Sequence, residues 1–119
     1  MGVLLLALFY TPAEVEHDFN TISGAEAYEA LANDDSIILI DVRTIEEHED
    51  VRIPNSIPLP FNELEETIVM LVPNRSYKIF VYCQRGIRSQ DASQILVDLG
   101  YTNVYNIGGI IDWPGALEE

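Results

Sequence analysis

The chain has 119 residues, a length that suits one compact domain with its own core, and 48% of them are hydrophobic, as in globular rather than disordered proteins. It carries 20 acidic and 6 basic residues, a formal net charge of -14. This acidity argues against nucleic acid and against an anionic membrane as the partner, because binding to either needs clustered cations.

The sequence contains a single cysteine, Cys83. One thiol excludes an internal disulfide and a cysteine-rich metal site, and no other residues show metal-ligand spacing, so we expect neither a metal nor another cofactor. We expect the two histidines, His17 and His48, to be solvated surface residues. A free thiol is compatible with a reducing compartment, and a cytoplasmic location is our prediction.

Residues 1–9, MGVLLLALF, form an apolar run that is too short to span a bilayer, which takes about 20 residues. No lysine or arginine precedes the run and no small-x-small cleavage pattern appears before Pro12, so we favour a strand, or an arm packed on the domain or on a second chain. A signal peptide or a membrane tether, and with it export, is the alternative. We assign residues 1–18 to this arm and an acidic connector, and residues 19–119 to one domain.

Two capping boxes mark helix starts in the first half of the domain. The motifs S-x-x-E at 23–26 and T-x-x-E at 44–47 each provide a hydroxyl that can accept from the backbone N–H three residues later. The β-branched, apolar run at 36–40 predicts a buried strand, and three prolines allow only a short edge strand afterwards. In chain order we expect a strand at 19–22, a helix at 24–32, a strand at 36–40, a helix at 45–50 and an edge strand at 57–59.

The second half of the domain repeats the alternation. Asn62, followed three residues later by Glu65, predicts the N-cap of a helix whose apolar residues recur at helical spacing. Gly100 is placed to end the last long helix. In chain order we expect a helix after 62 that includes Val72, a strand at 78–82, a helix at 88–99, a strand at 103–106, a backbone turn at 107–109 and a half-helix at 110–113.

Strands that alternate with amphipathic helices predict an α/β domain with a mainly parallel sheet and helices on both faces. In such sheets ligands bind beyond the carboxyl ends of the strands. Cys83 and the segment Asp41-Val42-Arg43 both fall at such ends, so we expect two polar clusters to converge on one edge of the domain.

Cys83 stands where a buried strand enters a compact loop that leads into a helix. A thiol attacks as the thiolate, which a helix N-terminus and nearby arginines favour. The backbone amides of Gln84–Ser89 can turn toward the sulfur, and Gly86 permits the positive φ that such a nest needs. Arg85 and Arg88 add positive charge. A buried, inert cysteine is the simpler alternative, which this combination disfavours.

The spacing of the loop arginine separates two chemistries. A cysteine phosphatase loop places an arginine after five intervening residues, where it can grip a tetrahedral phosphate through two hydrogen bonds. In this chain Ser89 takes that position and Arg88 comes after four residues. The shorter loop favours a smaller target, such as a terminal sulfur.

From about Phe19 to Gly115 the sequence resembles the single-domain rhodaneses, the sulfurtransferase family. Its marks follow the family order: Asp41-Val42-Arg43 with Glu47 just after, Ile53-Pro54 with Ile57-Pro58, the loop CQRGIR at 83–88 with Ser89, and Gly108-Gly109 with Trp113. Where the family usually has Gly-His before the first Ile-Pro and Gly-Ala after it, this chain has Val51-Arg52 and Asn55-Ser56. Asn55 tolerates left-handed backbone angles and can replace the glycine, whereas losing the histidine alters the rim of the site.

The resemblance implies a three-layer α/β domain with a five-stranded, mainly parallel sheet. It also implies that Cys83 accepts a sulfane sulfur as a persulfide, held by the backbone N–H groups of the loop. Arg88 would close this cradle, and Asp41 and Arg43 would brace the loop from behind. The predicted site comprises Cys83, the substrate-binding loop of Gln84, Arg85, Gly86, Ile87, Arg88 and Ser89, the supporting pair Asp41 and Arg43, and Arg52 at the rim.

We therefore predict a sulfurtransferase that moves a sulfane sulfur from thiosulfate or a persulfide donor to a thiol or cyanide acceptor. The expected partners are that small donor and a thiol acceptor, free or carried by a protein, and the oligomeric state is left open. A non-catalytic rhodanese-like domain that binds a partner or carries sulfur is the first alternative. A cysteine-dependent phosphatase or arsenate reductase is the second, which the short loop disfavours.

Overall fold

The structure is a computed structural model that describes residues 18–119, so the predictions for the apolar run and most of the connector lie outside the described residues. The elements alternate as the sequence predicts. In chain order they are β1 (Asn20–Thr21), α2 (Gly24–Asn33), β2 (Ile38–Asp41), α3 (Ile45–Asp50), β3 (Ile57–Pro58), α4 (Phe61–Leu71), β4 (Ile79–Cys83), α5 (Ile87–Asp98), β5 (Val104–Gly109) and the 3-10 turn η1 (Ile110–Asp112).

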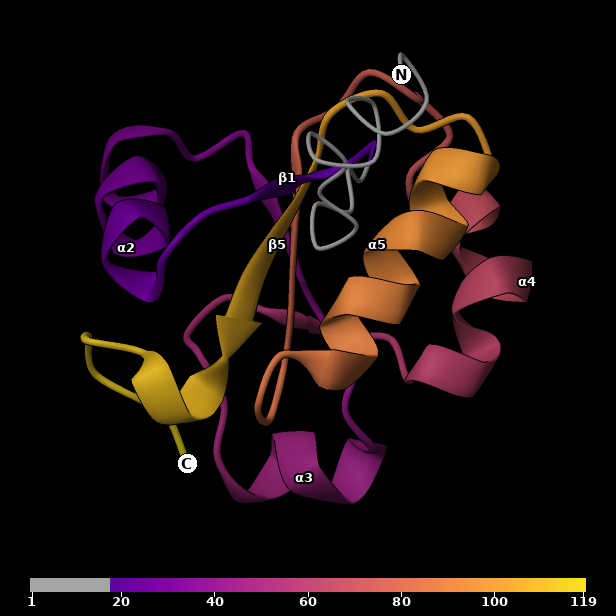
Figure 1. The fold of residues 1–119 in the computed structure, drawn as a ribbon. Helices are drawn as coiled ribbons and strands as arrows, with labels where there is room; N and C mark the ends of the chain where they lie inside the picture. Colours follow the sequence, from indigo (N-terminus) through magenta and orange to yellow (C-terminus); the bar gives the residue numbers. More distant parts are fainter. Residues whose placement is uncertain (1–17) are drawn as a thin grey trace, which may run out of the picture.

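The five strands form one parallel sheet in the order β1-β5-β4-β2-β3. All five residues of the central strand β4 are buried, because strands flank it on both sides and helices cover both faces. In Figure 1, α2 lies on one side of the sheet and α4 and α5 on the other. The three-layer α/β sandwich expected from the sequence is confirmed.

Each face of the sheet has its own apolar core. The core under α4 and α5 includes Ile40, Val42, Val81, Leu64, Ile68, Ala92 and Leu96, together with Cys83. The core under α2 includes Ala27, Leu39, Ile53, Phe80, Tyr82, Ile107 and Ile110. Alternate residues of β4 therefore point into different cores, and the last of them, Cys83, points toward α5.

Two of the three predicted helix caps are confirmed. Ser23 and Thr44 begin α2 and α3, each with a complete capping box. The predicted cap at Asn62 is wrong, because α4 begins at Phe61 after Pro60 and has no side-chain cap. Pro60 already holds a φ of -51°, and the Phe61 N–H is satisfied by the Val42 carbonyl at 3.0 Å, so a capping side chain is not required.

The last strand is longer than predicted. The segment expected as a backbone turn at 107–109 continues β5, which pairs Gly109 with Cys83. The pairing register shifts by one residue beside Tyr82, next to Gly108, which has a φ of 90°. Gly109 has no side chain, and a Cβ there would overlap the Gln84 carbonyl oxygen, so only glycine lets β5 approach the loop so closely.

Candidate active site at the carboxyl edge of the sheet

Cys83 is the last residue of β4, and its side chain is buried, with 1% of the residue exposed. The neighbouring strand β2 ends beside it, because Asp41 pairs with Tyr82 in the parallel register. The two polar segments are thus brought together at one edge of the sheet. A hydrogen bond of 3.5 Å from Arg43 Nη1 to Gln84 Oε1 joins them.

Backbone N–H groups of the following loop converge on the sulfur. The Gly86 N–H donates to Cys83 Sγ at 3.0 Å and the Ser89 N–H at 3.4 Å, and Ser89 Oγ also lies 3.4 Å from the sulfur. Gly86 has a φ of 98° and is the N-cap of α5, with no side chain of its own to cap the helix. The first turn of α5 therefore directs its free N–H groups and its positive dipole end at Cys83.

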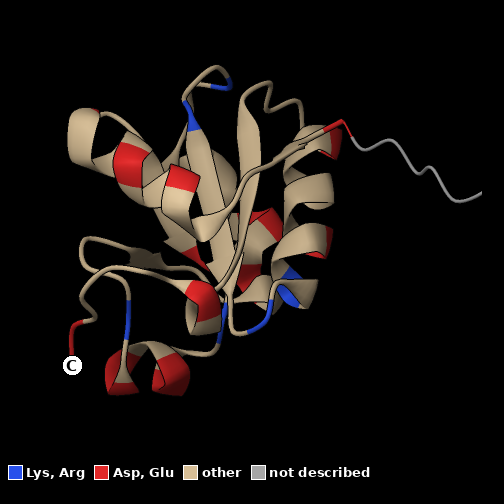
Figure 2. Cartoon of the chain, turned by 60° about the vertical axis from the view of Figure 1, so that its left-hand side comes forward, with Lys and Arg blue, Asp and Glu red and all other residues tan. Residues whose placement is uncertain are grey.

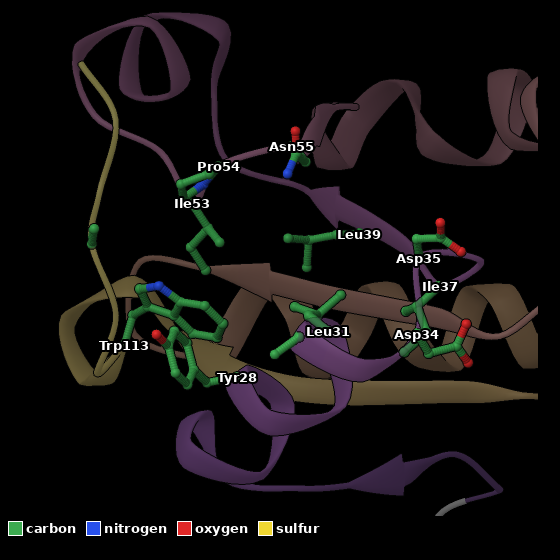
Figure 3. Close-up of a pocket in the computed structure, with 12 residues that line it drawn as sticks. Tyr28, Leu31, Asp34, Asp35, Ile37, Leu39, Ile53, Pro54, Asn55 and Trp113 are labelled. Atoms are coloured by element: carbon green, nitrogen blue, oxygen red, sulfur yellow. The ribbon is translucent and has the colours of Figure 1, made fainter.

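The hollow in front of the sulfur is small, about 210 Å³, and is lined by Cys83, Gln84, Arg85, Ile87 and Arg88. Ile87 is 72% exposed, so the mouth of this hollow has an apolar as well as a cationic rim. A larger hollow of about 430 Å³ lies between α2 and β2, with Leu31, Leu39 and Trp113 among its walls (Figure 3). No residue of the Cys83 loop lines it, so we place the candidate site by the thiol of Cys83 and not by cavity size.

Arg88 is held from outside the loop by an ion pair. Its Nη1 and Nη2 donate to the two carboxylate oxygens of Glu47 at 2.8 and 3.1 Å, and Glu47 also belongs to the capping box of α3. The hydrogen bond from Arg88 lowers the pKa of Glu47 to about 2, and the same bond raises the pKa of Arg88. The ion pair ties α3 to the first turn of α5, beside the sulfur.

Behind the loop lies a buried cluster centred on the carboxylate of Asp41. Arg43 Nη2 donates to Asp41 Oδ2 at 2.8 Å, and the Tyr82 hydroxyl donates to the same oxygen at 3.0 Å. Burial opposes the charge of Arg43, yet its hydrogen bond to the Asp41 carboxylate and the attraction between the two charges keep its pKa raised. Burial raises the pKa of Tyr82 to about 12, so the phenol stays a donor.

The prediction that His48 is a solvated surface residue is wrong. The residue is only 9% exposed, and its Nδ1 lies 2.9 Å from Asp41 Oδ2. The short helix α3 folds back over the end of β2, which turns the fourth residue after its cap inward. His17 lies outside the described residues.

Arg52, predicted at the rim, is engaged with the C-terminal segment. Its Nη2 lies 2.9 Å from Glu118 Oε1, and the backbones of the two residues form an antiparallel bridge. Its Nη1 also donates to the His48 carbonyl at 3.4 Å. Asn55, nearby, has a φ of 67°, which confirms the left-handed backbone expected for it.

Two polar residues of the site were missed in the sequence, Tyr82 and Asn106. The Asn106 carboxamide accepts from Ser89 Oγ at 2.8 Å and from the Gly108 N–H at 3.0 Å. The sequence contained a signal for Asn106. It lies two residues after buried Val104 in the strand, on the same face, and so should also face the interior. The signal was weak, since the predicted strand ended at that residue.

Basic residues line the hollow at this edge of a strongly acidic molecule. Figure 2 shows basic residues toward both ends of the molecule. Four of the 6 in the chain are residues of the predicted site: Arg85 and Arg88 line the hollow, Arg43 donates to Gln84, and Arg52 contacts the C-terminal segment. Three of the four form ion pairs with acidic residues. Arg85 has no such ion pair within residues 18–119 and leaves its positive charge at the mouth of the hollow.

The described part of the chain contains no helix with the length and hydrophobicity needed to cross a bilayer.

Comparison with known proteins identifies the family. The model of the rhodanese-like domain matches residues 23–116. The chain is 38% identical over 73 residues to the thiosulfate sulfurtransferase PspE of Escherichia coli (strain K12), an alignment that covers 61% of this chain and 70% of that protein. It is 34% identical over 87 residues to YrkF of Bacillus subtilis (strain 168), a protein named as a candidate sulfur carrier. That alignment covers 72% of this chain and 46% of YrkF.

Solved structures agree with this match. The structure of a rhodanese with anions from E. coli superposes with a TM-score of 0.66 at 34% identity, over 70% of this chain and 98% of that chain.

Proposed function

The chain belongs to the rhodanese-like domain family, and from this membership we propose that it is a sulfurtransferase that carries a sulfane sulfur on Cys83. The donor is thiosulfate or a persulfide, and the acceptor is a thiol or cyanide. The relatives named for thiosulfate sulfur transfer and for sulfur carriage support this class of chemistry.

In the proposed reaction the Cys83 thiolate attacks the outer sulfur of thiosulfate. A bond forms between Sγ and that sulfur while the sulfur–sulfur bond of the donor breaks, and sulfite leaves with the bonding electron pair. The product is a Cys83 persulfide with a negative charge on its outer sulfur. A thiolate or cyanide then attacks the outer sulfur, which returns Cys83 to the thiolate.

The observation that carries the proposal is the convergence of the loop on one sulfur atom. The N–H groups of Gly86 and Ser89 are already aimed at Sγ, so they stabilise negative charge there without further rearrangement. Arg88 and Arg85 line the hollow in front, which suits a small anionic donor. The hollow of about 210 Å³ has room for a small anion.

The roles that we propose for the other residues follow from their contacts. Arg88, aligned by Glu47, closes the hollow. Asp41 and Arg43 support the loop through Gln84. Arg52 joins α3 to the C-terminal segment and acts on the rim only indirectly.

A direct test is to incubate the reduced protein with thiosulfate and to measure its intact mass. We expect a gain of one sulfur atom in the natural sequence and none in Cys83→Ser, followed by loss of the sulfur as thiocyanate when cyanide is added. No gain in the natural sequence, or an equal gain in Cys83→Ser, would refute the proposal.

A sulfur-carrier function is the second candidate, favoured by the similarity to YrkF. A carrier and an enzyme both form the persulfide, but they differ in turnover with small acceptors. An enzyme releases many equivalents of thiocyanate per chain in excess thiosulfate and cyanide, whereas a carrier keeps the sulfur on Cys83 and releases little thiocyanate to this small acceptor. The same assay therefore decides between them.

A further inference from the structure

The Ser89 hydroxyl has more hydrogen-bond acceptors around it than it has protons. Ser89 Oγ lies 2.8 Å from Asn106 Oδ1, 3.4 Å from Cys83 Sγ and 3.4 Å from the Gly108 carbonyl oxygen. A serine hydroxyl carries one proton and two lone pairs, so it can donate to only one of these atoms at a time. Ser89 is fully buried, so bulk water does not reach it to donate to the acceptors that Ser89 leaves unsatisfied.

Asn106 is positioned to compete for that proton. It lies on β5, is 6% exposed, and its Oδ1 also accepts the Gly108 N–H at 3.0 Å. This second bond keeps the carbonyl end of the carboxamide directed at Ser89. The 2.8 Å distance is that of a well-formed hydrogen bond, whereas 3.4 Å to sulfur is a contact that strengthens once the sulfur is charged.

We propose that Asn106 is a positioning residue that holds the Ser89 proton while Cys83 is a neutral thiol and yields it when the sulfur becomes anionic. In the thiol state Ser89 donates to Asn106, and its free lone pair accepts from the Cys83 S–H. When the sulfur is a thiolate, the Ser89 O–H rotates to donate to Sγ, and Asn106 keeps its bond from Gly108. No covalent bond changes, and the proton stays on Ser89 throughout.

Asn106 thus has a measurable effect on Cys83, although the two side chains share no direct hydrogen bond within residues 18–119. Breaking the bond between Ser89 and Asn106 is part of the cost of turning the hydroxyl to the sulfur. Removing the Asn106 acceptor removes this cost, so the thiolate becomes easier to form. Removing the hydroxyl takes away the third donor to the sulfur, so the thiolate becomes harder to form.

The charged groups near the sulfur come from several elements. Arg85 and Arg88 lie on the loop and α5, Glu47 on α3, and Asp41 and Arg43 at and just after the end of β2. Substitutions at Ser89 and Asn106 that introduce no charge leave all five in place. If a substitution at Asn106 changes the ionisation of Cys83 only when the Ser89 hydroxyl is present, these five charges therefore do not explain the change.

A double-mutant cycle tests the inference, which rests on Cys83 being the reacting group of the proposed function. Asn106→Ala is made with Ser89 present and in the Ser89→Ala background, where the backbone N–H of residue 89 is retained. The fraction of Cys83 thiolate is measured from its ultraviolet absorbance as a function of pH. Cys83 is the single cysteine of the chain, so no other thiolate contributes, and Cys83→Ser provides the blank. Asn106→Leu, which keeps the number and branching of the side-chain heavy atoms, is the second variant, and the unfolding midpoint of each protein shows that it is folded.

With Ser89 present, we expect Asn106→Ala and Asn106→Leu to raise the ratio of thiolate to thiol at a fixed pH by about three- to tenfold, the range expected for one neutral hydrogen bond. Ser89→Ala should lower the ratio. In the Ser89→Ala background, either change at Asn106 should alter the ratio by less than about 1.5-fold, because the hydroxyl that couples them is gone.

Equal effects of the Asn106 changes in the two backgrounds would overturn the inference, as would a lower thiolate ratio in both Asn106 variants with Ser89 present. Neither outcome depends on sulfur transfer, because no sulfur donor is added. Failure of the cycle is thus distinguishable from failure of the proposed function, which the thiosulfate mass measurement reports.

Discussion

At the N-termini of α3 and α5, different side-chain atoms accept hydrogen bonds from the free backbone N–H groups of the helix. At α3 the N–H of the third helical residue, Glu47, donates to the hydroxyl of the cap, Thr44, at 3.1 Å. At α5 the N–H of the third helical residue, Ser89, donates at 3.4 Å to Cys83 Sγ, because the cap is Gly86 and has no side chain. One helix is capped by its own residue, and the other by a sulfur that precedes the cap by three residues.

This difference fits the roles that we propose, in which the start of α3 serves stability and the start of α5 serves the chemistry of Cys83. A hydroxyl cap permanently satisfies one of the free N–H groups and contributes about 1 kcal/mol to the free energy of unfolding. A sulfur in the same place can gain and lose charge, and the N–H groups then stabilise whichever form is negative. Glu47 and Arg88 join the two helix starts through their ion pair, so the structural cap also aligns the reactive one.

The largest expected effect comes from breaking the α5 start with Gly86→Ala. An alanine with a φ near 98° costs about 1 to 2 kcal/mol, and any relief of that strain moves the Gly86 N–H away from the sulfur. We expect sulfur uptake from thiosulfate to slow by about tenfold or more, which corresponds to about 1.4 kcal/mol in the barrier.

Gly100→Ala is the matched control for this variant. Gly100 has a φ of 96° and follows the C-cap of the same helix, with only Arg75 near the added Cβ. Both variants should lose similar stability in denaturant unfolding, but only Gly86→Ala should slow sulfur uptake. A comparable loss of uptake in Gly100→Ala would mean that general stability, and not the N–H geometry, explains the effect.

An intermediate effect is expected from removing the cap of α3 with Thr44→Ala. The loss of the hydroxyl should lower the free energy of unfolding by about 1 kcal/mol. Because the Glu47 N–H loses its bond to the Thr44 hydroxyl, Glu47 is held less firmly for Arg88, and sulfur uptake should fall slightly, by less than about threefold. Urea unfolding followed by circular dichroism measures the stability.

Ser23→Ala provides the comparison for Thr44→Ala, since Ser23 forms the equivalent capping box on α2. It should cost similar stability and leave sulfur uptake unchanged. If Ser23→Ala slowed uptake as much as Thr44→Ala, the link from the α3 cap through Glu47 to Arg88 would be wrong.

The smallest effect is the pH dependence of the ion pair between the two helix starts. The pKa of Glu47 falls from 4.5 to about 2 on folding, mainly through the hydrogen bond from Arg88. A folded-state pKa below the unfolded value means that the ionised form stabilises the fold. The contribution is therefore complete above about pH 4.5 and is lost as the pH falls toward 2.

Both side chains of this ion pair are about one third exposed, at 37% and 32%, so solvent screens it and we expect no more than about 1 kcal/mol. Glu47→Gln should lower the unfolding free energy at pH 7 and flatten its decline between pH 5 and pH 2. Identical slopes for the two proteins in this pH range would show that other carboxylates account for the acid sensitivity.

Local sequence determined the parts of this protein that depend on a few neighbouring residues. The capping boxes at Ser23 and Thr44, the left-handed Asn55 and the loop after Cys83 were all predictable, because hydrogen bonds over three residues and the φ of single residues depend little on the remaining chain. Alternation of apolar strands and helices was enough to predict the parallel sheet, and with it the edge where Cys83 lies.

The tertiary structure alone decided which distant side chains meet at that edge. The bond from Arg88 to Glu47 spans 41 residues and that from Ser89 to Asn106 spans 17, so each depends on strand order and register. Burial of His48 follows from α3 packing over the end of β2, which its charged sequence does not indicate. The sequence located Cys83 at the end of a strand and before a helix, whereas the side chains that surround its sulfur come from strands and helices that only folding brings together.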